Sequence, residues 1–336
     1  MAPPVRFGVG YDFRNPLGSG VPTSRVYGEI LDQIVAAEEW GYDLVWFTEH
    51  HFMEDGYLPA WVPVAGAVAA RTSRIRIGTD IALLPLAHPV RLAEEVAVLD
   101  NLSNGRIDLG LGMGYAPHEF KAFGVNLKNR VSLMEEGIQV LQAAWSGEPF
   151  TFQGKRWSFE DLRVTPDPVQ PGGPPLWLAA MTGAGARRAA RFHCHFLPQG
   201  SKEDTLDVWR AETAAAGVEP DTRRVGIVKS WLVTDDRDRD WPDVRAAERY
   251  RMSTYHRLFE EAQTTFQLGG KAAIPQTWIV GDEDRVEAEM AAFITEYGIT
   301  DLVTWAVPPG FAPDRTAVSL ERFARNVAPR LRQRFS

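Results

Sequence analysis

The chain has 336 residues, of which 45% are hydrophobic and 24% are charged, as in ordinary globular proteins and unlike disordered or fibrous chains. Its net charge of −8 argues against nucleic acid as a partner, because nucleic-acid-binding proteins normally present a basic face. No apolar run is long enough for a signal peptide or a membrane span, and the single cysteine, Cys194, rules out an internal disulfide. We therefore expect a cytoplasmic protein, with residues 1–336 forming one α/β domain.

Strand and helix signals alternate along most of the chain. Short apolar runs predict strands over residues 5–10, 43–47, 75–84, 107–111, 176–180, 193–197, 225–233 and 301–305. Apolar residues at helical spacing predict helices over residues 24–40, 62–71, 89–104, 130–145, 183–192, 202–216, 282–297 and 314–331. Eight strands, each followed by a helix, predict a (β/α)8 TIM barrel, with a doubly wound open sheet as the rival fold.

Two stretches interrupt this alternation. Residues 147–175 contain short β-like pieces at 150–152 and 157–159, followed by a proline-rich connector. Residues 234–276 contain helical and aromatic material. We interpret both stretches as insertions, after the fourth and seventh strand regions, and the second as a candidate lid over a pocket.

The apolar run from Leu44 to Phe47 ends in Thr48, Glu49, His50 and His51. Active sites of such barrels lie at the carboxyl ends of the strands, which is where these side chains fall. Histidine titrates near neutral pH, so His50 or His51 could exchange a proton or donate a hydrogen bond to a developing anion. The alternative is that one of the two imidazoles is simply packed below the site.

Two other patterns carry weaker signals. His193 and His195 would project to one face of a strand, as in some metal sites, but no third ligand follows at a recognised spacing, so we predict no metal. A shared surface position or a core hydrogen bond is the simpler role for these two histidines. The glycines from Gly110 to Gly114 would let the backbone approach a flat ligand or another loop closely, or would form a tight turn.

Three motifs together resemble the bacterial luciferase-like flavin-dependent monooxygenase family. They are Glu49 to Phe52, Gly78 to Pro89, and Asn104 to Gly124, and the similarity covers nearly the whole chain. The resemblance implies a TIM barrel that oxygenates a small organic substrate, with O2 as cosubstrate. It also implies reduced FMN, supplied by a partner flavin reductase, and a homodimer.

The resemblance also implies roles for individual residues. His50 matches the catalytic histidine and His51 its neighbour in the pocket wall, while Thr79–Asp80 matches a non-proline cis peptide against the flavin ring. The remaining implied cofactor-binding residues are those of the glycine-rich segment and of the flavin phosphate loop, namely Gly112, Met113, Thr182, Gly183 and Gly185. Backbone N–H groups at a helix start suit a phosphate.

Two departures from the family pattern keep a second cofactor open. Met113 stands where luciferase has a phosphate-binding arginine, and Met181 replaces an acidic residue of the phosphate loop. Arg130 or an arginine near Arg187 could compensate. The alternatives are a deazaflavin (F420)-dependent hydride-transfer enzyme on the same fold and a noncatalytic flavin-binding relative.

Overall fold

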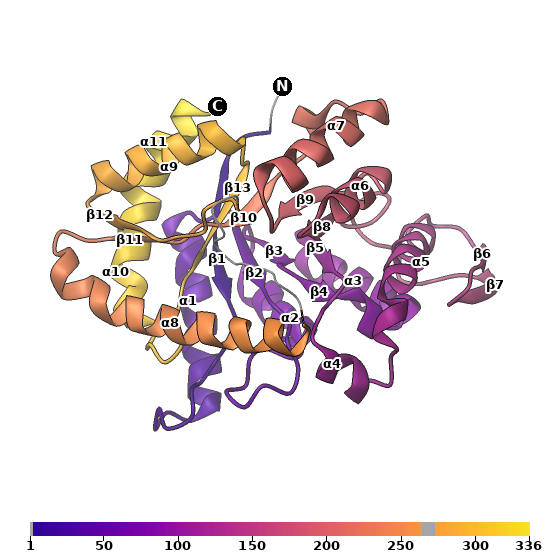
Figure 1. Cartoon of the computed structure of the whole chain (residues 1–336), viewed down its shortest axis with the longest axis horizontal. Coiled ribbons are helices and arrows are strands. Elements are labelled where there is room, and N and C mark those ends of the chain that lie inside the picture. The colour runs from indigo at the N-terminus through magenta and orange to yellow at the C-terminus, as the bar shows by residue number, and fades with distance from the viewer. Residues whose placement is uncertain (1–2, 264–272) are drawn as a thin grey trace.

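The computed structural model describes residues 3–263 and 273–336 and has a barrel of parallel strands surrounded by helices (Figure 1). The strands of the barrel are β1 (Arg6–Tyr11), β2 (Leu44–Phe47), β3 (Arg76–Thr79), β5 (Ile107–Gly112), β8 (Leu176–Ala180), β9 (His195–Pro198), β10 (Gly226–Val228) and β13 (Asp301–Trp305). They pair in the order β10-β13-β1-β2-β3-β5-β8-β9, and a parallel bridge between Phe196 and Val225 links the two ends. The predicted TIM-like barrel is confirmed, and the open doubly wound sheet was the wrong alternative.

Helices are found in each stretch where the apolar spacing predicts one, and the structure adds a short helix at 117–122 that was not predicted and a long helix at 237–261 within the second interrupting stretch. They are α1 (Thr23–Trp40), α2 (Trp61–Arg71), α3 (Pro89–Ser103), α4 (Pro117–Ala122), α5 (Arg130–Ala144), α6 (Gly183–Arg191), α7 (Val208–Ala215), α8 (Arg237–Glu261), α9 (Glu283–Tyr297), α10 (Asp314–Arg322) and α11 (Ala328–Arg334). Short 3-10 turns occupy 84–86, 127–129 and 220–222, and π-helical turns occupy 202–207 and 323–327. The end predicted for α1 is confirmed, since Gly41 has a φ of 103° and caps the helix in the left-handed conformation.

Two of the predicted long strands are each broken in two. The stretch 75–84 divides into β3 and the short β4 (Ala82–Leu83), with a cis peptide between them. The stretch 225–233 divides into β10 and β11 (Trp231–Val233), and β11 pairs with β12 (Ile279–Gly281) in a separate sheet. Apolar residues on both sides of each break favoured one strand, although the polar pairs Thr79-Asp80 and Lys229-Ser230 stand at the two breaks.

The two interrupting stretches have different structures. Within 147–175, β6 (Phe150–Gln153) and β7 (Ser158–Leu162) form an antiparallel hairpin at the right of Figure 1. Within 234–276, α8 runs for 25 residues across the lower part of that view. Residues 264–272 of the second stretch lie outside the described residues. No helix among the described residues is long and apolar enough to span a membrane.

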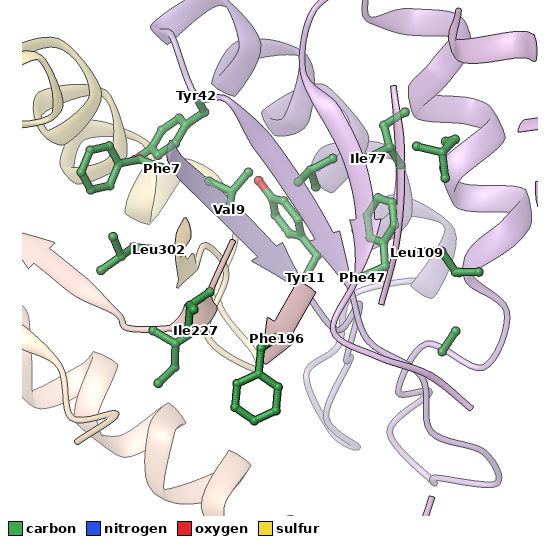
Figure 2. Packing of buried hydrophobic residues seen from close by; sticks show 14 of the residues in the cluster. Phe7, Val9, Tyr11, Tyr42, Phe47, Ile77, Leu109, Phe196, Ile227 and Leu302 are labelled. Carbon is green, nitrogen blue, oxygen red and sulfur yellow. The ribbon is translucent and has the colours of Figure 1, made fainter. Parts of the chain in front are cut away.

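Alternation along the strands separates two apolar cores. One face of each strand packs outward against the helices, and Figure 2 shows this outer cluster, with Phe7, Val9 and Tyr11 along β1. A smaller cluster inside the barrel is formed by Leu44, Trp46, Trp177, Leu197 and Val303. A Cβ on Gly226 would stand 2.5 Å from the ring of Trp46, so this glycine makes room for the indole.

Charged residues close the amino end of the barrel. Arg6 Nε donates to Asp301 Oδ1 at 2.5 Å, and Arg76 Nε donates to Asp108 Oδ2 at 2.7 Å. His195 lies in this layer, where its Nδ1 accepts the backbone N–H of Arg224 and burial lowers the pKa of the imidazole to about 4. The expected core hydrogen bond of His195 is therefore found at the end of the barrel opposite the strand carboxyl ends.

His193 does not lie beside His195 on a strand, contrary to our expectation. Its φ of 56° places it in a turn before β9, with its side chain exposed. A left-handed residue interrupts the extended backbone that would have aligned the two imidazoles. Within residues 3–263 and 273–336, no group of three or more His, Cys, Asp or Glu side chains could hold a metal ion.

Candidate active site

The carboxyl end of β2 delivers His50 to a buried carboxylate. His50 Nδ1 lies 2.9 Å from Glu119 Oε1, and the same oxygen accepts the backbone N–H of His51 at 2.9 Å. Glu119 is fully buried in the first turn of α4. Burial by itself would raise the pKa of Glu119, but the hydrogen bonds from His50 and His51 together hold it below its usual value.

His51 has a different set of partners. Its Nε2 lies 2.8 Å from Glu49 Oε1, and Glu49 Oε2 accepts the backbone N–H of Leu83 in β4 at 2.9 Å. The imidazole packs edge-on against Phe123, with ring centroids 4.7 Å apart. The side chains of the two adjacent histidines thus diverge, and His51 ties the end of β2 to β4.

Three tyrosines surround the ring of His50. The ring centroids of Tyr57, Tyr115 and Tyr255 lie 4.9, 5.7 and 6.1 Å from that of His50. The hydroxyls of Tyr57 and Tyr255 are 2.9 Å apart, and the hydroxyl of Tyr115 is 3.4 Å from His50 Nε2. Burial raises the pKa of all three phenols, to about 12 for Tyr255, so they are neutral at physiological pH. His50 therefore sits in an aromatic enclosure with little access for water.

Helix α8 supplies Tyr255 and is anchored over the barrel by two buried arginines. Arg251 Nη1 bonds Glu248 at 2.6 Å, its Nε lies 3.3 Å from Asp12 Oδ2, and its guanidinium stacks 4.2 Å above the ring of Trp305. Arg14 Nη2 donates to Thr254 Oγ1 of α8 at 2.6 Å. The sequence marked this region only as a candidate lid. The charged residues that fix it stand some 240 positions from their partners, so no local pattern pointed to them.

At the end of β3, the cis peptide joins Asp80 and Ile81, one residue later than the predicted Thr79–Asp80 bond. The backbone N–H of Asp80 still donates to Phe47 O at 2.8 Å, so regular pairing with β2 continues through Asp80 and the break follows it. Burial raises the pKa of Asp80 from 3.8 to about 7. The hydroxyl of Thr79 is committed to β5, because it donates to Gly110 O at 2.7 Å.

The glycines of β5 make room for this break in β3. A Cβ on Gly110 would lie 1.9 Å from Thr79 O, and one on Gly112 would lie 1.7 Å from Ile81 Cδ1. Of the roles left open by the sequence, close approach of another chain segment is therefore the one found. Met113 is half-buried and packs against the outer core.

The start of α6 offers donors for an anion. Thr182 caps the helix, and its Oγ1 accepts the N–H of Gly185 at 3.4 Å. The N–H groups of the first turn have no partner inside the helix. The guanidinium of Arg187 lies 3.6 Å from the position that a Cβ on Gly183 would occupy, so a positive charge flanks the same turn. Hydroxyl, amide and guanidinium donors together fit a phosphate group.

These features converge because their strands are neighbours. The strands β2, β3, β5 and β8 follow one another in the barrel and are all parallel, so their carboxyl ends open on one side. His50, Asp80, Gly112 and Thr182 stand at or just beyond those four ends. The sequence did not assign a role to Glu119 or Tyr57, although the acidic residue two positions after Pro117 at a helix start was a visible signal.

Comparisons with known proteins agree with this arrangement. Residues 5–301 match the family model described as luciferase-like monooxygenase. An F420-dependent glucose-6-phosphate dehydrogenase of Nakamurella multipartita is 29% identical over 350 positions, which cover 98% of this chain and 97% of that protein. The alkanal monooxygenase alpha chain of Photorhabdus luminescens is 33% identical over 162 residues, but the match covers only 48% of this chain and 44% of that one.

Two solved structures are similar over nearly the full length. Monooxygenase RslO1 from Streptomyces bottropensis superposes with a TM-score of 0.82 at 25% identity, covering 97% of this chain and 99% of that one. The oxygenating constituent of 3,6-diketocamphane monooxygenase from Pseudomonas putida, solved with FMN, gives 0.79 at 22% identity and covers 98% and 99%, a likeness of fold alone. The chain belongs to the luciferase-like monooxygenase family, which contains both FMN-dependent monooxygenases and F420-dependent dehydrogenases.

Proposed function

We propose that the protein is the oxygenase component of a two-component monooxygenase that uses reduced FMN and O2 on a small organic substrate. The observation that carries the proposal is the buried imidazole of His50, held by Glu119 and enclosed by tyrosines at the mouth of the barrel. Oxygen activation by a reduced flavin requires a site that excludes water and offers a proton or hydrogen-bond donor. A separate flavin reductase and a homodimeric assembly are parts of the same proposal.

Different residues would bind the cofactor and exchange protons with the reacting groups. Thr182, the first turn of α6 and Arg187 would hold the phosphate of FMN, and the backbone from Asp80 to Ile81 would face its ring. Bound reduced FMN would supply the electrons that activate O2. His50 Nε2, the ring nitrogen not engaged by Glu119, would accept a hydrogen bond or a proton when the imidazole is neutral and would donate to the reacting oxygen atoms when it is protonated.

Hydride transfer with deazaflavin F420 is the second candidate function. The match to an F420-dependent dehydrogenase that covers 98% of this chain favours it, since the match to the alkanal monooxygenase covers half. Met113, an uncharged side chain where luciferase carries a phosphate-binding arginine, also weighs toward it. Nε2 of His50, which lies 3.4 Å from the hydroxyl of Tyr115, could serve either reaction, because both need a positioned proton donor or acceptor.

Parallel anaerobic titrations of the purified protein with reduced FMN and reduced F420 test the proposal. We expect saturable binding of reduced FMN and, on mixing with O2, reoxidation that is much slower than for free reduced FMN. Saturable binding of F420 with no binding of reduced FMN would reject the first candidate in favour of the second.

A His50→Ala variant separates an enzyme from a noncatalytic flavin-binding relative. We expect it to bind reduced FMN as the wild type does but to change the rate of the reaction with O2. Arg257→Ala, at an exposed position of α8, is the matched control and leaves both quantities unchanged. Equal binding and equal oxygen reactivity in wild type and His50→Ala would favour the noncatalytic alternative.

A further inference from the structure

We propose that Glu119 is a positioning residue that fixes His50 in the tautomer with its proton on Nδ1, leaving Nε2 as the nitrogen available for chemistry. The catalytic meaning of this role rests on the function proposed above. The tautomer itself is a property of the protein without cofactor, so it can be tested separately.

The geometry of the pair determines the direction of its hydrogen bond. An ionised carboxylate can only accept hydrogen bonds, so the 2.9 Å contact between Glu119 Oε1 and His50 Nδ1 requires a proton on Nδ1. The backbone N–H of His51 donates to the same oxygen at 2.9 Å and holds the carboxylate in place. Glu119 Oε2 has no hydrogen-bond partner among the described residues. The carboxylate thus depends on His50 for its one side-chain donor.

The ionised form of Glu119 is the one that this environment favours. Burial opposes the charge, but the bonds from His50 and from the His51 backbone outweigh it and lower the pKa of Glu119. Removing the His50 side chain would leave this buried carboxylate with the backbone N–H of His51 as its remaining donor, which is costly. The pair therefore behaves as one unit.

No other charged group competes for His50 within residues 3–263 and 273–336. The side chains that face its ring are Tyr57, Tyr115 and, from α8, Tyr255, all of them neutral phenols. Glu49 bonds the neighbouring His51, and the carboxylate of Asp12 is paired with Arg251. Glu119 is therefore the charged side chain in contact with this imidazole, and the tautomer follows from that contact.

A second histidine–glutamate pair provides a matched control. His118 Nδ1 lies 2.7 Å from Glu261 Oε2, and the pair is about one-third exposed. Glu261→Gln tests the loss of a carboxylate beside a histidine without touching His50. At position 119, three proteins are compared: the wild type, Glu119→Gln and Glu119→Ala. The amide oxygen of the glutamine can still accept a hydrogen bond from His50 Nδ1, whereas alanine has no acceptor.

The tautomer can be measured by long-range proton–nitrogen correlation NMR on cofactor-free protein with isotopically labelled histidine, with His50 assigned by its loss in His50→Gln. We expect the Nδ1–H form in wild type, Glu119→Gln and Glu261→Gln, and a new Nε2–H population in Glu119→Ala. An Nε2–H tautomer in the wild type overturns the proposal even if Glu119→Ala does not fold. So does an unchanged pure Nδ1–H form in a folded Glu119→Ala.

A double-mutant cycle on the reaction of bound reduced FMN with O2 tests whether the positioning of His50 by Glu119 affects the reaction. If Glu119 acts through His50, His50→Ala changes the rate constant, and adding Glu119→Ala to it causes no further change. Independent, multiplicative effects would contradict the positioning role. If reduced FMN does not bind while the NMR result holds, the proposed function fails and the tautomer assignment stands.

Discussion

The carboxyl group of Asp80 stands between the continuous part of β3 and the cis peptide that ends it, at the level of the barrel where His50 and Thr182 also lie. Because burial raises its pKa to about 7, Asp80 is protonated in a large part of the molecules near neutral pH and can then donate a hydrogen bond. An aspartic acid in that form is one of few donors at this end of the strand, since the hydroxyl of Thr79 is engaged with β5.

The raised pKa of Asp80 predicts a pH dependence of stability. The folded state binds this proton more tightly than the unfolded state, so the free energy of unfolding falls as pH rises from the ordinary value of 3.8 to about 7. Asparagine does not titrate, so Asp80→Asn should not show this fall in the free energy of unfolding. Relative to the wild type, the variant should therefore be more stable above neutral pH than it is in acid. Urea midpoints of both proteins on either side of pH 7 measure the difference. A constant offset between the two curves would show that Asp80 has an ordinary pKa.

At the scale of elements, β3 and the neighbouring parallel strand β5 are in very close contact near the site. Gly110 and Thr79 are locked together by the threonine hydroxyl, which donates to Gly110 O at 2.7 Å and accepts its N–H at 3.0 Å. The Cβ of any other residue at position 110 would meet the backbone oxygen of Thr79 rather than a side chain that could rotate away. The close contact between β3 and β5 therefore depends on a glycine at position 110.

Gly110→Ala should lower the free energy of unfolding by about 3 kcal/mol or more, because a backbone strand must move to admit the methyl group. Gly28→Ala is the matched control, since Gly28 is exposed in α1 and its Cβ would meet nothing within 4 Å. That change should stabilise the protein by about 0.5–1 kcal/mol. Chemical denaturation of the two variants gives both numbers, and similar midpoints would refute the steric argument.

Helix α8 is the other element on which the site depends. Arg251 is 1% exposed and balances the buried Asp12, so Arg251→Leu would leave that carboxylate without its partner. We expect a loss of about 3–5 kcal/mol in the free energy of unfolding. Arg257→Leu on the exposed face of α8 is the control and should change stability by less than about 0.5 kcal/mol. Limited proteolysis should cut α8 faster in the first variant only.

In the whole molecule, the amino end of the barrel is closed by ion pairs, whereas the carboxyl end carries the candidate site. The amino end is closed by ion pairs that involve Arg6, Arg76, Asp108 and Asp301, and Asp301 is also bonded by Arg224 Nη1 at 3.1 Å. These residues come from four strands and from the segment just before β10, so they link neighbouring strands next to the bridge that closes the barrel. The carboxyl end keeps its polar groups for the site and is covered by α8.

The ion pairs at the amino end predict how the molecule responds to acid. Burial opposes ionisation of Asp108, but its bonds with Arg76 outweigh this and lower its pKa. Its contribution to stability is therefore present at neutral pH and is lost as pH falls below the ordinary aspartate range. Asp108→Asn should be less stable than wild type by about 2 kcal/mol at neutral pH, and the gap should narrow in acid. A gap that stays constant down to acid unfolding would contradict this account.

Local pattern in the sequence determined most of the barrel. Apolar runs and helical spacing are properties of neighbouring residues, so the strands, the helix after each of them, the cap at Gly41 and the position of His50 at the end of β2 could all be predicted. The same signals could not locate the cis peptide, which follows from where β3 stops pairing with β2, or show that β11 leaves the barrel. The strand with which a given strand pairs is remote in sequence, so local hydrophobicity does not identify it.

The local pattern of the sequence named His50 and His51 together, and the resemblance matched His50 to the catalytic histidine. Only the tertiary structure showed how their surroundings differ, because Glu119 and Glu49 approach from different elements and bond different imidazoles. Likewise, residues 234–276 could be described only as irregular aromatic sequence until the structure showed that buried charges in the loop after β1 fix α8 over the barrel. The sequence specifies which side chains the protein carries. Which of them share a buried hydrogen bond depends on distances that only the folded backbone sets.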